Sequence, residues 1–149
     1  MRGGALKAVN LGIGQTIPFL RRCRFQVLAL RPGYIKAKIP LKGNKNHFGA
    51  MYAGALFTVA EAPGGVLALM DFNDGFFPVL KDLKIDFIKI TKSDVTVCFE
   101  MSEEERSHIL TDTVKNTKSD FQLVGSIVDK DGVVVATTVA SYQLRSKKG

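Results

Sequence analysis

A long apolar segment with a single charged residue is the feature that most constrains this chain. Between Ala50 and Met70 the only charged side chain is Glu61. Small residues surround it, namely Ala53, Gly54, Ala55, Ala60, Ala62, Gly64 and Gly65. They allow other backbone segments to approach closely, and an isolated carboxylate in apolar surroundings is costly unless something binds or uses it. The segment is therefore predicted to be a buried helix, at residues 49–70, that carries one acid.

The same segment is long enough, at about 20 residues, to cross a lipid bilayer. Glu61 lies near its centre, and the sequence Pro63-Gly64-Gly65 follows at once. The chain after this segment is strand-like and needs a helix to cover it. We therefore expect a core helix, and no membrane as a partner.

Six segments have the features of β-strands. In residues 34–41, apolar Ile35 and Ala37 alternate with Lys36 and Lys38, which is typical of a strand with one buried face. The other expected strands are residues 25–31, 83–90, 94–101, 121–128 and 133–144.

Two further helices are expected, one on each side of the central part of the chain. Residues 1–20 form an N-terminal helix and its lead-in, and Pro18 ends the helix. Ser102 followed by Glu105 is the signature of a capping box, which predicts a helical insertion between strands at residues 102–115.

This order of elements favours an α+β fold, with a six-stranded antiparallel sheet wrapped around one long central helix. The chain of 149 residues is expected to form a single domain, residues 1–149. A helix that is apolar on every side must be covered on every side. One curved sheet covers most of it, and a second copy of the protein could cover the rest.

The composition of the chain indicates which classes of binding partner to expect. The formal net charge is +7, but the basic residues are scattered, and no block reaches five like charges. A small molecule that carries phosphates suits scattered lysines better than a nucleic acid does. The chain has no Trp and three Tyr, so an aromatic stacking platform for bases is not expected.

Cysteine and histidine usage indicates the compartment and the kind of chemistry. Cys23 and Cys98 show no CxxC spacing, which predicts reduced, buried thiols and a cytoplasmic location. Two distant histidines and two distant cysteines do not make a metal site, so neither a metal nor a cofactor is expected.

A spaced set of residues runs from a polar loop into the central helix: Asn46, Gly49, Tyr52, Ala53, Gly54 and Glu61. This set resembles a motif of the hotdog-fold thioesterase superfamily, most closely the thioesterases of the phenylacetic acid pathway and the uncharacterised hotdog domains related to them. Tyr52 and Ala53 stand where that family usually has His and Gly. The resemblance extends over about residues 20–145 and implies the hotdog fold.

The resemblance also implies an activity, the hydrolysis of an acyl-CoA or other acyl thioester. Glu61 would act as a general base on water or attack directly, the backbone N–H of Ala53 would bind the oxyanion, and Asn46 would orient the thioester or the water. We assign substrate contacts to five further residues: Gly54, Tyr52, His47, Lys89 and Lys92.

Helix geometry makes an independent prediction about assembly. Ala53 and Glu61 are eight residues apart, which is about 12 Å along one helix. One carbonyl carbon cannot lie within reach of both residues. Two antiparallel helices in a two-fold homodimer would bring the two groups together. The family resemblance implies the same shared site at a dimer interface, and it implies pairs of dimers, a homotetramer.

Two other functions remain open. One is a hotdog hydroxyacyl dehydratase, since His47 and Glu61 have a suitable separation of fourteen residues, although the prolines expected near the histidine are absent. The other is a non-enzymatic or inactive hotdog protein that binds an acyl ligand. Each residue also has a purely structural interpretation: Glu61 as a paired buried acid, Asn46 as a turn residue, and His47 as a loop residue.

Overall fold

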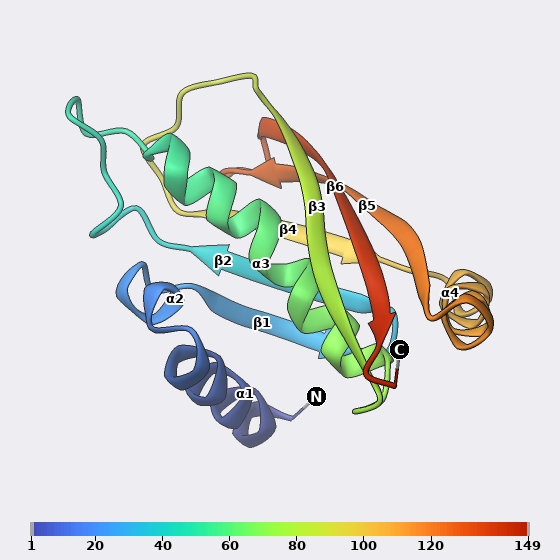
Figure 1. Cartoon of the computed structure of the whole chain (residues 1–149). Coiled ribbons are helices and arrows are strands. Elements are labelled where there is room, and N and C mark those ends of the chain that lie inside the picture. The colour runs from blue at the N-terminus through green and yellow to red at the C-terminus, as the bar shows by residue number, and fades with distance from the viewer. Residues whose placement is uncertain (1, 149) are drawn as a thin grey trace.

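A six-stranded antiparallel sheet is the framework of the computed structural model, which describes residues 2–148 (Figure 1). The strands are β1 (Gln26–Arg31), β2 (Tyr34–Ile39), β3 (Phe76–Phe87), β4 (Val95–Glu100), β5 (Lys118–Val128) and β6 (Val134–Ser146). They lie in the order β1-β2-β4-β5-β6-β3, and every neighbouring pair is antiparallel. The predicted fold class is confirmed.

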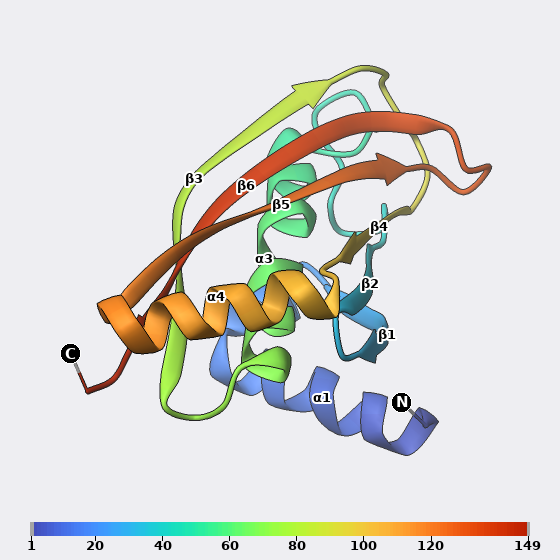
Figure 2. The ribbon, with the colours of Figure 1, turned by 90° about the vertical axis from the view of Figure 1, so that its right-hand side faces the viewer.

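The central helix, α3 (Ala53–Asp71), lies in the curve of this sheet (Figures 1 and 2). It packs against all six strands, and Val59, Ala60 and Leu67 are fully buried. By length and composition α3 could cross a membrane, but 56% of its most apolar 18-residue window is buried inside the protein. The helix is therefore the core element around which the sheet curves.

The central helix begins at Ala53 rather than near residue 49. The reason is that the backbone before it makes hydrogen bonds to other segments. The Met51 N–H donates to the Thr91 carbonyl at 2.8 Å, and the Tyr52 N–H donates to the Asn44 carbonyl at 2.9 Å. These bonds fix the loop that precedes the helix against the chain that follows β3.

The N-terminal segment forms two helices rather than one, α1 (Gly3–Thr16) and α2 (Pro18–Arg22). They are separate because Pro18 disfavours a helical conformation in the residue before it. The Asn10 side chain ties α1 to β1, since it accepts from the Val27 N–H at 2.7 Å and donates to the Val27 carbonyl at 3.0 Å. As a result α1 packs on α2 and β1 rather than on α3.

The last helix, α4 (Glu103–Asn116), lies on the outside of the sheet against β5 (Figure 2). Its predicted capping box is confirmed. The Ser102 hydroxyl accepts from the Glu105 N–H at 3.0 Å, and the Glu105 carboxylate accepts from the Ser102 N–H at 2.8 Å.

Two further predictions from the sequence are wrong in detail. The strand expected at residues 83–90 begins earlier, at Phe76, because the whole of β3 pairs with β6. Cys98 is exposed rather than buried, since its neighbours Val97 and Phe99 occupy the inward positions of β4. Cys23 is half-buried.

Candidate functional site

The N-terminus of α3 presents unpaired backbone donors. Tyr52 is the N-cap residue, and its side chain makes no capping hydrogen bond. Within residues 2–148, no acceptor is found for the N–H groups of Ala53 and Gly54. Such groups lie at the positive end of the helix dipole and can bind developing negative charge. Ala53 lines a cavity of about 200 Å³, whose walls also include Asn46 and Lys89.

Asn46 closes the loop that leads into the helix. Its side-chain oxygen accepts from the N–H groups of Phe48 at 3.1 Å and Ala50 at 3.0 Å. Gly49 completes the loop with a φ of 83°, a conformation that favours glycine. In the described part of the chain the side-chain nitrogen of Asn46 has no acceptor, so it is free to donate to a ligand. The structural interpretation of Asn46 is therefore correct for its oxygen and leaves its nitrogen available.

The other residues that were expected to contact substrate do not all lie beside this cavity. The Tyr52 ring is 57% exposed and covers Gly54, where an added Cβ would overlap it. His47 is exposed and packs edge-on against Phe48, with ring centroids 4.7 Å apart. Lys92 is exposed and, unlike Lys89, does not line the cavity at the start of the helix.

Glu61 lies further along α3 in a very different environment. Its side chain is half-buried, and no cation or hydrogen-bond donor is found for its carboxylate among residues 2–148. Burial raises the pKa of Glu61 above its ordinary value. The carboxylate lines a cleft of about 730 Å³ whose other walls are almost entirely apolar. Within residues 2–148 Glu61 therefore lacks the partner that a paired structural acid would have.

The backbone at Glu61 is fixed from the sheet. The buried Tyr142 hydroxyl donates to the Glu61 carbonyl at 2.7 Å, and an added Cβ at Gly64 would overlap the Tyr142 ring. Burial, with a smaller contribution from the nearby Glu61 charge, raises the pKa of Tyr142. The tyrosine therefore acts as a neutral donor that holds this turn of α3 against β6.

Within one chain the two halves of the expected site are apart. Asn46, Ala53 and Lys89 line the small cavity, and Glu61 lines the large cleft, with no residue common to both. This is the separation that the eight-residue spacing predicts.

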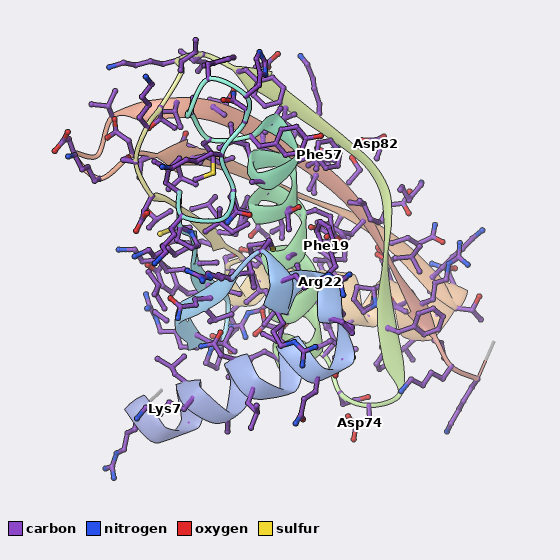
Figure 3. The ribbon with its side chains drawn as sticks, turned by 90° about the vertical axis from the view of Figure 1, so that its left-hand side faces the viewer. Lys7, Phe19, Arg22, Phe57, Asp74 and Asp82 are labelled. Atoms are coloured by element: carbon purple, nitrogen blue, oxygen red, sulfur yellow. The ribbon has the colours of Figure 1, made fainter. Side chains whose placement is uncertain are left out.

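Sequence reasoning missed two parts of the site. The first is Tyr142, because a contact between residues 81 positions apart leaves no local pattern. The second is the wall that α1 and α2 add to the cleft, with Phe19 on α2 facing the same side of the molecule as Phe57 on α3 (Figure 3). Val9 and Ile13, one helical turn apart, were the available signal for that wall.

No cluster of three or more histidine, cysteine or acidic side chains that could hold a metal ion occurs within residues 2–148.

A curved antiparallel sheet around one helix that carries an acid defines a hotdog-fold protein, and solved structures agree. A protein of unknown function from Pseudomonas aeruginosa, described as a probable thioesterase, has a TM-score of 0.89 and 36% identity over 94% of this chain and 95% of its own. A thioesterase from Haemophilus influenzae has a TM-score of 0.76 and 13% identity over 95% of this chain and 90% of its own.

A third solved structure, a protein of unknown function from Chlorobaculum tepidum, has a TM-score of 0.85 and 13% identity, and it covers 96% of this chain and 95% of its own. At 13% identity these likenesses concern the fold alone. Residues 6–143 match the family described as a domain of unknown function, DUF4442, and the chain belongs to that family. A search of curated proteins finds no match.

Proposed function

We propose that this protein is an acyl-CoA thioesterase whose active site lies between two copies of the chain. The observation that carries the proposal is the Glu61 carboxylate, half-buried and without a partner in the described chain, at the wall of an apolar cleft. A charge kept at such a cost is typical of a catalytic group. The likeness to the Pseudomonas aeruginosa protein, described as a probable thioesterase, supports the same activity.

The proposed reaction uses three groups. Glu61 of one copy takes a proton from water, and the water oxygen attacks the thioester carbonyl carbon. The N–H of Ala53 from the other copy binds the resulting oxyanion, and the free amide of Asn46 orients the thioester. Collapse of the intermediate breaks the carbon–sulfur bond, and the proton held by Glu61 passes to the leaving sulfur. A carboxylic acid and a thiol are released, and Glu61 returns to its carboxylate form. Direct attack by Glu61, with an anhydride hydrolysed in a second step, uses the same groups.

The free edge of the sheet supports the proposed dimer. β3 is an edge strand with 12 residues, and its outer side has no partner within residues 2–148. A long unpaired edge readily pairs with another chain. Exposed Phe87 and Ile88, at the end of this strand, add apolar surface beside it. A second copy that pairs along β3 would cover both, and pairs of such dimers would give the tetramer.

Glu61→Gln tests the function directly. We expect kcat on a good acyl-CoA substrate to fall by on the order of 10²-fold, because the neutral amide keeps the shape but cannot accept the proton. Thiol release from a panel of acyl-CoA substrates, followed with a thiol-trapping dye, measures it, and a melting curve on the same preparation reports the fold. Wild-type turnover in the variant would contradict the proposal.

The same panel separates the two alternatives. A hydroxyacyl dehydratase releases no thiol but interconverts hydroxyacyl and enoyl thioesters. The structure gives this function less support, since His47 packs against Phe48 and lines neither cavity. A binding protein would protect an acyl ligand without turning it over.

A further inference from the structure

The cleft beside Glu61 has room for a ligand. It lies between α3 on one side and α1 with α2 on the other, and its volume of about 730 Å³ is in the range of small-molecule sites. Asn10 fastens α1 to β1, and α1 makes its main contacts with α2 and β1. The facing sides of these helices are apolar, so the fold leaves two apolar surfaces apart that would otherwise close on each other.

The charge distribution restricts what can occupy the cleft. Among residues 2–148 no lysine or arginine lines it, and Glu61 is the one charged side chain that does. The other polar side chains are the hydroxyls of Thr16 and Thr58. A phosphate or carboxylate group is therefore excluded by repulsion and lack of donors, and an uncharged hydrocarbon fits.

The rim of the cleft indicates the same kind of ligand. Ile17, Phe19 and Leu69 line it and are between 49% and 65% exposed, and Phe57 is 43% exposed. Figure 3 shows Phe19 on α2 and Phe57 on α3 on the same face of the molecule. Large apolar side chains that gather in this way are typical of a site for an apolar ligand.

Two glycines on opposite walls leave the cleft open. Gly12 on α1 and Gly65 on α3 both line it, and an added Cβ at either position would meet no heavy atom within 4 Å. Glycine within a helix costs about 0.5–1 kcal/mol relative to alanine. No close contact requires glycine at either position, so the absence of a side chain there serves only to leave the cleft open.

We propose that this cleft binds the aliphatic acyl chain of the substrate and that Gly12 and Gly65 set the chain length that it accepts. The proposal rests on the proposed function, because it places the reacting carbonyl at Glu61 and the hydrocarbon between α1 and α3. The phosphates of the thiol carrier then lie outside the cleft, since no lysine or arginine among residues 2–148 lines it.

Binding can be measured without turnover. S-alkyl thioethers of coenzyme A cannot be hydrolysed, and titration calorimetry with the butyl, octyl and dodecyl compounds reports the affinity for each chain. We expect the affinity to rise by about fourfold for each added methylene until the cleft is full.

Filling the cleft should shorten the accepted chain. Gly65→Leu and Gly12→Leu are expected to weaken dodecyl binding by at least tenfold and to leave butyl binding within twofold of wild type. Gly4→Leu is the matched control, since Gly4 also lies in α1 with open space around it but does not line the cleft. Melting curves of all three variants show whether each is folded.

The outcomes separate this inference from the proposed function. Hydrolysis of short acyl-CoA with no effect of either glycine variant on the dodecyl compound would overturn the inference and leave the thioesterase standing. Chain-length-dependent binding without any thiol release would overturn the proposed thioesterase activity and leave the acyl-chain site standing. A change of oligomeric state in Gly65→Leu, with unchanged dodecyl affinity, would mean that a second copy fills the cleft, and would also overturn the inference.

Discussion

Two acids on α3 show how the environment of a single residue distinguishes structure from function. The Asp71 side chain is only 1% exposed, and its carboxylate accepts from the Gly33 N–H at 2.9 Å and lies 3.6 Å from the Arg106 guanidinium. Burial raises the pKa of Asp71, but both of these partners oppose the rise. Glu61 has burial alone, without any compensating partner in the described chain. The fold therefore holds Asp71 for stability and leaves Glu61 available for chemistry.

The raised pKa of Glu61 predicts how stability depends on pH. Between the unfolded pKa, near 4.3, and the raised folded pKa, the folded state binds more protons than the unfolded state, so stability falls as pH rises. Glu61→Gln removes this loss. We expect the variant to melt at a higher temperature than wild type at neutral pH and the difference to vanish below pH about 4. Melting curves across this range test it, and a lower melting temperature at neutral pH would show that Glu61 is stabilised by a partner.

The two lysines expected to bind coenzyme A phosphates are no longer equivalent, since only Lys89 lines the cavity beside Ala53. Lys89→Glu should raise KM for acyl-CoA several-fold and change kcat little, because a remote phosphate contact is made equally in the ground and transition states. Lys92→Glu is the matched control with the same change of net charge. Steady-state kinetics at low salt distinguish them, and equal effects would mean that the whole basic surface, rather than a particular contact, attracts the substrate.

The sequence predicts the environment of a single residue well when that environment depends on neighbouring positions in the chain. The isolation of Glu61 in an apolar run is visible in the sequence, and the structure leaves it unpaired. For Asn46 the sequence leaves open a turn residue or a substrate contact, because a sequence cannot show that the loop uses the side-chain oxygen alone. Tyr142 was not predicted at all, since its hydrogen bond to α3 depends on the curvature of the sheet.

At the level of a single element, two glycines of α3 show how the sequence determines close packing. Gly64 and Gly65 are adjacent, but Gly64 faces Tyr142 of β6 and Gly65 faces the open cleft. The two adjacent glycines therefore have different structural roles, because they lie on different sides of the helix.

Alanine at each glycine should have opposite effects. Gly64→Ala forces Tyr142 and the helix apart, which should cost about 1–3 kcal/mol. Gly65→Ala meets nothing and gains helix propensity, which should stabilise by up to about 1 kcal/mol. Chemical denaturation of the two variants measures both values. Equal destabilisation would contradict the packing of α3 against β6 described above.

Elements and boundaries with local signals were predictable, and boundaries set by distant segments were not. The capping box fixes the start of α4, and alternation identifies β2. The start of α3 and the length of β3 depend on hydrogen bonds to segments far along the chain, with Thr91 and with β6. Periodicity within one segment carries no information about such partners.

For the whole molecule, the central question is whether one chain or two make the site. Ala53 and Glu61 line different cavities of the same chain, so under the proposed mechanism a chain acting alone would need a second base or a second donor. Ala53 offers a clean way to remove the donor. It is the first residue of α3, where proline is well tolerated, and the preceding Tyr52 is already extended, with φ −66° and ψ 137°. Ala53→Pro therefore deletes the N–H and keeps the helix.

Mixing two inactive variants decides between the arrangements. Glu61→Gln chains retain Ala53, and Ala53→Pro chains retain Glu61, so a mixed dimer with a shared site has one intact site and one that lacks both groups. After unfolding and refolding of an equal mixture, about half of the dimers are mixed, and turnover should recover to about a quarter of the wild-type value per chain. Each variant refolded alone is the control. Recovery no greater than the average of the two variants would place the whole site within one chain and would contradict the shared site.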